Sequence, residues 1–96
     1  MKKIIMTEGR HIDYKVEENC IIFGDDDLML NLKNREMNEK VVIDICTDIN
    51  GFLVVGTASG NRYAAQIEIP ARIYTDEQAV PFDIDNCTLY VWGLEE

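Results

Sequence analysis

The chain has 96 residues, of which 47% are hydrophobic, and it carries a formal net charge of −9. A chain of this length and composition builds one modest core, so we expect a single folded domain over residues 1–96. The acidic balance argues against binding of nucleic-acid phosphates and of anionic membranes, because both require clustered Lys and Arg. It is compatible with a basic protein partner.

The N-terminal part of the chain contains short runs with the patterns of β-strands. Residues 3–7 predict an edge strand, and residues 11–16 alternate apolar and polar side chains. The chain returns through an apolar run at residues 20–23, and a further strand alternates at residues 28–33. Residues 34–40 have no strand pattern and predict a loop or at most one helical turn.

Residues 41–69 predict a central three-stranded meander. Asn-Gly at residues 50–51 and Ser-Gly at residues 59–60 separate three strand-like runs, and Asn-Gly favours a tight hairpin because a type I′ turn needs positive φ. A two-residue loop between the first two strands would pair Thr47 with Val54. A two-residue loop between the second and third strands would pair those two strands with each other. Both faces of these strands carry apolar residues, so we expect each face to be covered, by a second sheet and loops or by another subunit.

The C-terminal part predicts one more strand. Pro70 lacks the N–H that a central strand needs, so the chain leaves the sheet or reaches its edge there. Residues 75–81 predict a polar surface loop, and residues 87–92 predict the last strand. Seven or eight short strands without a confident helix predict an all-β fold, either a small antiparallel β-sandwich or a barrel.

The cysteines and the N-terminus indicate the compartment. Cys20, Cys46 and Cys87 lie far apart in strand-like runs, which predicts small buried side chains in a reducing environment. The apolar run before Thr7 is too short for a signal peptide or a membrane span, so we expect a cytoplasmic protein.

Catalytic and cofactor motifs do not emerge from the sequence. The single serine, Ser59, fits a turn, and the hairpin pattern puts the single histidine, His11, about 15 Å from Cys20 at roughly 3.3 Å per residue. The glycines of residues 51–60 lie in hairpins and a strand, not before a helix, so no phosphate loop is expected. We therefore predict no enzyme activity and no cofactor.

An acidic run at residues 25–27 invites comparison with a calcium-binding loop. Met29 and Leu30 occupy the positions that would need an oxygen ligand and a glycine, so the loop pattern fails. We expect Asp25, Asp26 and Asp27 to solvate a turn and to protect a strand edge, and we predict no metal site. Adventitious cation binding is the alternative.

Aromatic residues near the C-terminus suggest an interaction patch. Tyr and Trp are enriched at interface hot spots, although they also fill β cores. The candidate patch comprises Tyr74, Tyr90 and Trp92 together with Leu53 and Val55.

Four segments carry a resemblance to a known group of proteins: residues 43–48, 67–74, 81–85 and 87–92. Together they resemble small uncharacterised proteins encoded in prophages and other mobile elements of gut-type bacteria. The resemblance implies a phage-related accessory or virion-associated role and brings no assigned active residues.

The sequence therefore predicts a non-enzymatic assembly or binding protein whose partner is a second copy of itself or another protein. The alternative is an acidic inhibitor that occupies a basic, nucleic-acid-binding groove of its partner. That alternative rests on residues 73–96, which contain six carboxylate side chains and no Lys or Arg.

Overall fold

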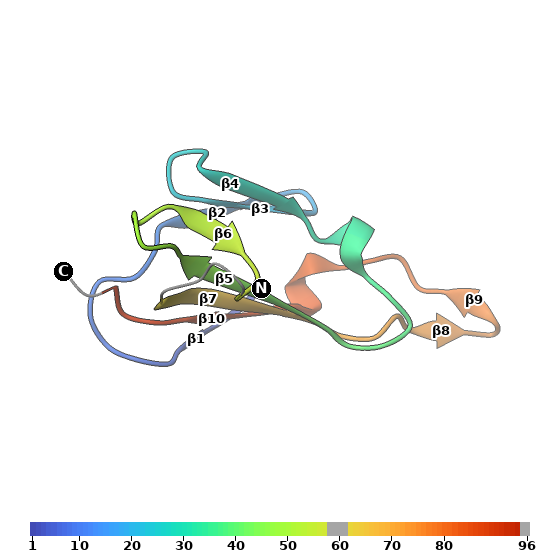
Figure 1. Cartoon of the computed structure of the whole chain (residues 1–96). Coiled ribbons are helices and arrows are strands. Elements are labelled where there is room, and N and C mark those ends of the chain that lie inside the picture. Colours follow the sequence, from blue (N-terminus) through green and yellow to red (C-terminus); the bar gives the residue numbers. More distant parts are fainter. Residues whose placement is uncertain (58–61, 95–96) are drawn as a thin grey trace.

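The computed structural model describes residues 1–57 and 62–94, and within them the regular structure is β-strand with two single turns of 3₁₀-helix (Figure 1). The prediction of an all-β fold is confirmed. The strands are β1 (Lys2–Ile5), β2 (Tyr14–Glu17), β3 (Cys20–Phe23), β4 (Leu28–Asn31), β5 (Val41–Thr47), β6 (Leu53–Val55), β7 (Arg62–Ile69), β8 (Tyr74–Thr75), β9 (Gln78–Ala79) and β10 (Thr88–Val91). The 3₁₀ turns are η1 (Lys33–Arg35) and η2 (Ile84–Asn86).

The strands form two stacked layers and a projecting hairpin. A five-stranded sheet has the order β1-β10-β7-β5-β6, and a three-stranded sheet of β2, β3 and β4 lies over one of its faces (Figure 1). Both sheets are open at their edges, so the architecture resembles a sandwich rather than a closed barrel. All pairings are antiparallel except that of β1 with β10, which is parallel.

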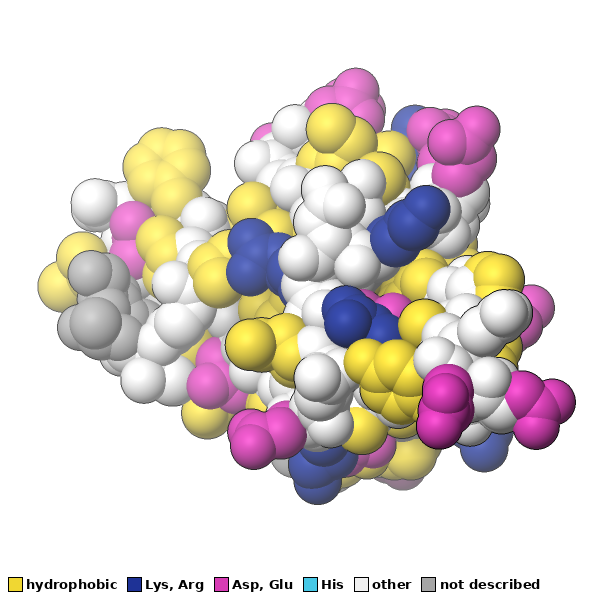
Figure 2. Space-filling view, turned by 90° about the vertical axis from the view of Figure 1, so that its right-hand side faces the viewer, with side chains coloured by type: hydrophobic (Ala, Val, Ile, Leu, Met, Phe, Trp, Pro, Cys, Tyr) yellow, Lys and Arg dark blue, Asp and Glu magenta, His cyan; other side chains and the backbone are white. Residues whose placement is uncertain are grey.

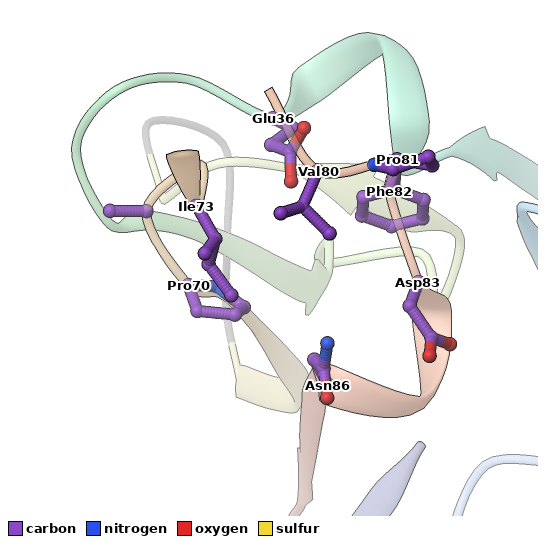
Figure 3. Close-up of a pocket in the computed structure, with 9 residues that line it drawn as sticks. Glu36, Pro70, Ile73, Val80, Pro81, Phe82, Asp83 and Asn86 are labelled. Atoms are coloured by element: carbon purple, nitrogen blue, oxygen red, sulfur yellow. The ribbon is translucent and has the colours of Figure 1, made fainter. Parts of the chain in front are cut away.

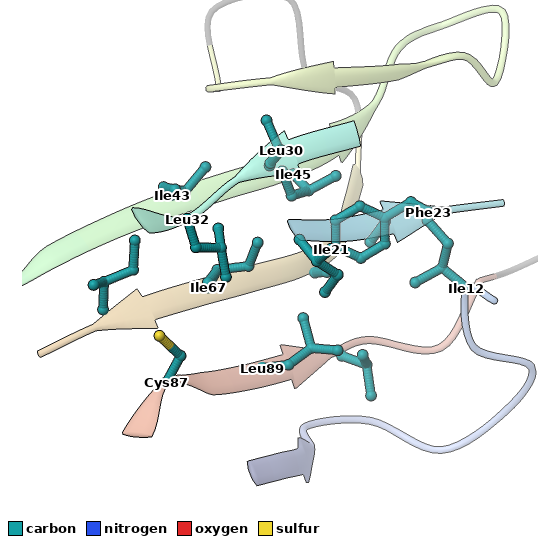
Figure 4. Close-up of a cluster of buried hydrophobic side chains, with 14 residues drawn as sticks. Ile12, Ile21, Phe23, Leu30, Leu32, Ile43, Ile45, Ile67, Cys87 and Leu89 are labelled. Carbon is teal, nitrogen blue, oxygen red and sulfur yellow. The ribbon is translucent and has the colours of Figure 1, made fainter. Parts of the chain in front are cut away.

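The hydrophobic core lies between the two sheets (Figure 4). The small sheet contributes Ile21, Phe23 and Leu30, and Leu32 follows it directly. The facing side of the large sheet contributes Ile43, Ile45, Ala65, Ile67, Ile69, Leu89 and Val91. Burying an Ile or Leu side chain contributes roughly 1.5–3 kcal/mol, so this cluster is the main source of stability.

The loop between β5 and β6 is one residue longer than the predicted two-residue turn. Asp48 and Phe52 close a three-residue loop, in which the Gly51 N–H donates to the Asp48 carbonyl at 3.0 Å and Gly51 has φ +85°. The Asp48 carboxylate also accepts from the Phe52 N–H at 2.9 Å. The correct register therefore pairs Thr47 with Leu53 instead of Val54, and every β6 side chain lies on the opposite face from the prediction.

The predicted meander order is also wrong, although the three antiparallel strands exist in one sheet. β5 lies between the other two, and β7 pairs with β5 instead of β6. The physical reason is length: β6 has three residues, whereas β5 has seven and can satisfy the eight-residue β7 along most of its backbone. The second predicted turn, at residues 59–60, lies outside the described residues.

A β-bulge at Ala64 changes the direction of the side chains in β7. Ile45 pairs with Ala65 and Cys46 pairs with Tyr63, so Ala64 is the extra residue. Ala64 and Ala65 are both fully buried in the core. Regular alternation would put Tyr63 on the same face as Ala65 and Ile67. Because the bulge breaks the alternation, Tyr63 lies on the opposite face.

The structure agrees with the prediction for residues 34–40 and differs from the prediction for residues 75–81. The 3₁₀ turn η1 is the only helical turn near residues 34–40, as expected for this part of the described chain. Residues 75–81, predicted as a loop, contain the second half of the β8–β9 hairpin, which projects from the end of the molecule (Figure 1). Asp76 and Glu77 adopt positive φ there, the geometry of a type I′ turn without its usual glycine.

Candidate functional site

One apolar row crosses the uncovered face of the five-stranded sheet, which we call the outer face. Strand pairing aligns Val54 of β6, Cys46 of β5 and Tyr63 of β7. Trp92 directly follows β10 and stacks on Tyr63, and Met6 directly follows β1 beside Trp92. These five residues, the apolar row, include one residue from each strand or its immediate end.

The two neighbouring rows of the outer face are increasingly polar. The next row contains Asp44, Gln66, Tyr90 and Ile4. The row beyond it, toward the β8–β9 hairpin, contains Val42, Glu68, Thr88 and Lys2. The outer face is therefore apolar at the end remote from the hairpin and charged at the end near it.

Within the apolar row, Tyr63 and Met6 are exposed to solvent, whereas Val54 and Trp92 are half-buried. The rings of Tyr63 and Trp92 are stacked with centroids 5.0 Å apart and planes 29° apart, and Tyr63 is 39% exposed. Met6 is 49% exposed, and Ile4 in the next row is 43% exposed. A stacked aromatic pair that is partly exposed to water is a candidate contact surface, since Tyr and Trp carry much of the binding energy at interfaces.

Cys46 is the buried member of the apolar row and does not belong to the core between the sheets. Its side chain is 3% exposed, and burial together with the nearby Asp44 carboxylate raises the pKa of its thiol. Partial burial, and then the charge and hydrogen bond of Asp44, raise the pKa of the Tyr63 hydroxyl. Asp44 also accepts a hydrogen bond from Gln66 Nε2 at 2.8 Å, so the carboxylate nearest the row has partners.

The five residues predicted as an interaction patch do not form one surface. Tyr90 and Trp92 lie on the outer face. Leu53 and Val55 pair with Thr47 and Ile45, on the core side of β6, where Leu53 packs against the core and Val55 is 46% exposed at the sheet edge.

Tyr74 lies on the projecting hairpin, where its hydroxyl donates to Asn38 Oδ1 at 2.7 Å. Sequence reasoning missed Tyr63, Met6 and Ile4 as members of the surface. The sequence signal for the position of Tyr63 was the Ala64-Ala65 pair, because two small residues can form a bulge that turns Tyr63 to the outer face.

A second candidate place is a small pocket of about 140 Å³ at the base of the hairpin (Figure 3). Apolar walls from Pro70, Ile73, Val80 and Phe82 surround it, with the polar side chains of Glu36, Asp83 and Asn86 among its lining. Its volume is below the roughly 300 Å³ at which ligand pockets begin, so it has room for a side chain rather than a cofactor.

Arg72 fastens the hairpin to the loop that follows η1. Its Nε donates to Glu36 Oε1 at 3.3 Å, and its guanidinium also donates to the Glu36 carbonyl at 3.0 Å. The Arg72 N–H donates to the Met37 carbonyl at 2.8 Å. Hydrogen bonds to Tyr74 and Glu36 raise the pKa of Arg72, so Glu36 has a permanent cationic partner.

The residues weighed for catalysis or metal binding have other contacts. His11 Nε2 lies 2.7 Å from the Thr7 carbonyl, and Cys20 pairs across the β2–β3 hairpin with Glu17. Asp26 lies in the turn between β3 and β4 with φ +63°, 3.9 Å from Lys15 Nζ. Within residues 1–57 and 62–94, no group of three or more His, Cys, Asp or Glu side chains could hold a metal ion.

The four described carboxylates of the C-terminal segment lie in separate places, and Glu95 and Glu96 lie outside the described residues. Asp76 and Glu77 form the hairpin turn, Asp83 caps η2 by accepting from the Asp85 N–H, and Asp85 lies 3.2 Å from the N-terminal ammonium of Met1. Figure 2, which faces the hairpin end, shows acidic side chains in several groups around the outline instead of one stripe.

No family model matches the chain, and the comparisons with curated proteins and with solved structures found no match either. The resemblance to small prophage proteins therefore stays a prediction. No helix in the described part of the chain combines the length and the apolar character needed to cross a membrane.

Proposed function

We propose that this protein is a non-enzymatic binding or assembly protein that uses the outer face of its five-stranded sheet. The observation that carries the proposal is the apolar row, which crosses that face with an exposed Tyr63 stacked on a half-buried Trp92. An antiparallel sheet with one covered face normally presents polar side chains to water on the other.

The chemistry of this surface suits protein contact. Contiguous apolar surface is costly to expose, and in soluble proteins it commonly marks an interaction site. The outer face combines aromatic and aliphatic side chains with a polar margin, the arrangement of a protein–protein interface.

The biological setting is part of the proposal. The resemblance to small proteins of prophages and mobile elements supports a structural or accessory role in such a gene set. We place the protein in the cytoplasm or in a virion, with another protein or a second copy of itself as partner.

A pull-down with three baits tests the proposal. Wild-type protein is immobilised beside Val54→Glu, which puts a charge into the apolar row, and Val55→Glu, which changes the neighbouring residue on the other face of β6. We expect wild type and Val55→Glu to retain the same partner and Val54→Glu to lose it. A monodisperse monomer that retains nothing from the lysate of its host or phage would contradict the proposal.

An acidic inhibitor is the alternative, and the separation of the four described C-terminal carboxylates weakens it. A basic groove is best filled by one continuous acidic stripe, whereas Asp76 and Glu77 lie at the hairpin tip and Asp85 contacts the N-terminus. Binding to a basic partner that disappears in high salt would favour the inhibitor, because such contacts are screened.

A further inference from the structure

We infer that Asn50 is a site of spontaneous modification, at which the side-chain amide is lost as ammonia, and that the Asp48 carboxylate slows this reaction in the folded protein. Both residues lie in the loop between β5 and β6, outside the core. The reaction goes beyond the proposed function and does not depend on it.

Asn50 precedes the residue type that most favours loss of an asparagine amide. The chain has seven asparagines, and only Asn50 is followed by glycine. The main-chain nitrogen of the following residue can attack the side-chain carbonyl of asparagine, and a glycine there has no Cβ to obstruct the approach. Asn50 and Gly51 are therefore the pair in this chain that is most open to the attack.

The reaction balances without an oxidant or a reductant. The Gly51 nitrogen loses its proton and forms a bond to Asn50 Cγ, the bond from Cγ to the amide nitrogen breaks, and ammonia takes up the proton. The product is a cyclic succinimide. Water then opens the ring at either carbonyl, which leaves an aspartate or an isoaspartate at residue 50 and adds one negative charge to a chain of net charge −9.

The surroundings of the loop leave room for the ring and admit water. Residues 49–52 are all exposed, with Ile49 at 87% and Phe52 at 69%. A Cβ atom at Gly51 would lie more than 4 Å from every described atom outside its chain neighbours. Packing therefore does not prevent the attack, and the hydrogen bonds of the loop are left to restrain it.

The turn holds the reacting atoms in a conformation unsuited to attack. The Gly51 N–H donates to the Asp48 carbonyl at 3.0 Å, which closes a β-turn. Neither Ile49 nor Asn50 has positive φ, so the turn is type I, in which the third residue has ψ of about 0°. Ring closure needs a large rotation about this angle to bring the Gly51 nitrogen to Cγ, and the rotation breaks the hydrogen bond of the same N–H.

The Asp48 carboxylate stabilises the unreactive conformation. Its Oδ1 accepts from the Asn50 N–H and from the Phe52 N–H, each at 2.9 Å, and so joins the residues on both sides of the reacting peptide bond. The Asp48 N–H also donates to the Phe52 carbonyl at 2.8 Å. Because the loop must open before the attack, these hydrogen bonds set its rate.

The isoaspartate product would disturb β6. It carries the main chain through the former side chain and so lengthens the three-residue loop by one carbon atom. β6 has only three residues and lies at the edge of its sheet, so it depends on closure of this loop. The modification would therefore loosen the strand that carries Val54 of the apolar row.

The test follows residue 50 by peptide mapping with mass spectrometry while the purified chain is incubated at mildly alkaline pH. We expect the mass gain of an amide exchanged for an acid at Asn50, faster than at any other asparagine. The folded chain should react at least about fivefold more slowly than the chain unfolded in guanidinium chloride, because the loop must open first.

Substitutions of Asp48 identify the restraint. Asp48→Ala removes both carboxylate hydrogen bonds and should raise the rate in the folded chain about fivefold. Asp48→Asn keeps a side-chain oxygen as acceptor and should stay within about twofold of wild type. The circular dichroism spectrum confirms that each variant is folded.

Gly51→Asn tests the attacking group. Asn tolerates the positive φ of this position, and its Cβ obstructs the approach of the main-chain nitrogen. This variant should lose the Asn50 amide far more slowly than wild type when both chains are unfolded.

Three results would overturn the inference. They are retention of the Asn50 amide in the unfolded wild-type chain, equal rates in the folded and unfolded chains, and an Asp48→Ala variant that reacts no faster than wild type. The comparison of folded with unfolded chain uses wild type alone, so it does not depend on the folding of a variant.

Discussion

Gly93 lies where the chain leaving β10 passes the segment that follows β1. Its N–H donates to Thr7 Oγ1 at 2.6 Å, and a Cβ atom at this position would overlap the backbone carbonyl of Glu8. A backbone group cannot move aside as the end of a flexible side chain can, so either the segment that follows β1 or the segment that follows β10 would shift.

We predict that Gly93→Ala lowers the free energy of unfolding by about 1–3 kcal/mol through overpacking. Gly51→Asn is the matched control, since Gly51 has open space around it and Asn tolerates its positive φ. Urea denaturation measures both. A loss for Gly93→Ala no larger than that for Gly51→Asn would contradict the predicted clash.

Cys87 is a second residue whose environment has a measurable consequence. Its side chain is fully buried, and burial raises the pKa of the thiol from an ordinary value of 9.0 to about 11. The charges of Glu36 and Asp83 add to the rise, while the N-terminal ammonium opposes it. Between pH 9.0 and about 11, the folded state therefore keeps the Cys87 thiol proton that the unfolded chain releases.

The stabilisation by the neutral Cys87 thiol is fully present below pH 9 and is lost as the pH rises toward about 11. We predict that Cys87→Ala makes the fall in unfolding free energy across this alkaline range shallower than in wild type. Cys20→Ala is the comparison, because Cys20 is only partly buried. Parallel curves for wild type and Cys87→Ala, from denaturation at a series of pH values, would refute the assignment.

At the scale of elements, the β8–β9 hairpin depends on contacts made at its base. An isolated two-stranded hairpin is marginally stable in water, and both strands of this one are exposed. Arg72 stabilises the hairpin at its base. Its side chain donates to the Glu36 carboxylate and to the Glu36 carbonyl, and its backbone N–H donates to the Met37 carbonyl. The hairpin is therefore positioned by one side chain and by the loop that follows η1.

We predict that Arg72→Lys loosens the hairpin by about 1 kcal/mol, because an ammonium cannot reproduce the planar set of guanidinium donors. The Val80 N–H, which donates to the Ile73 carbonyl at 2.7 Å, should then exchange with deuterium roughly fivefold faster. Arg35→Lys on the exposed end of η1 is the control. Equal Val80 exchange in all three proteins would show that Arg72 does not hold the hairpin.

At the scale of the whole molecule, the chain is elongated, with principal extents of 50 × 23 × 23 Å. The apolar row lies at the end of the sheet remote from the hairpin, since Tyr63 is near the start of β7 and Trp92 follows the end of β10.

Parts of the candidate site could be predicted from the sequence and parts could not. The strand that ends in Tyr90 and Trp92 was recognisable from alternation alone. Tyr63 was assigned to the wrong face because the Ala64 bulge breaks that alternation, and Val54 was misplaced because the β5–β6 loop has three residues instead of two. A one-residue error in register exchanges the two faces of a strand completely.

The sequence by itself determined the all-β class, the positions of most strands and the apolar residues available for a core, because alternation and turn residues act over a few neighbouring positions. The tertiary structure decided which strands pair, because that choice depends on matching lengths and hydrogen bonds across distant segments. It placed β5 between β6 and β7, and through the bulge it assembled Tyr63, Trp92 and Met6 from three separate segments into one surface. No local pattern contains that information, since these residues become neighbours only when the whole sheet has formed.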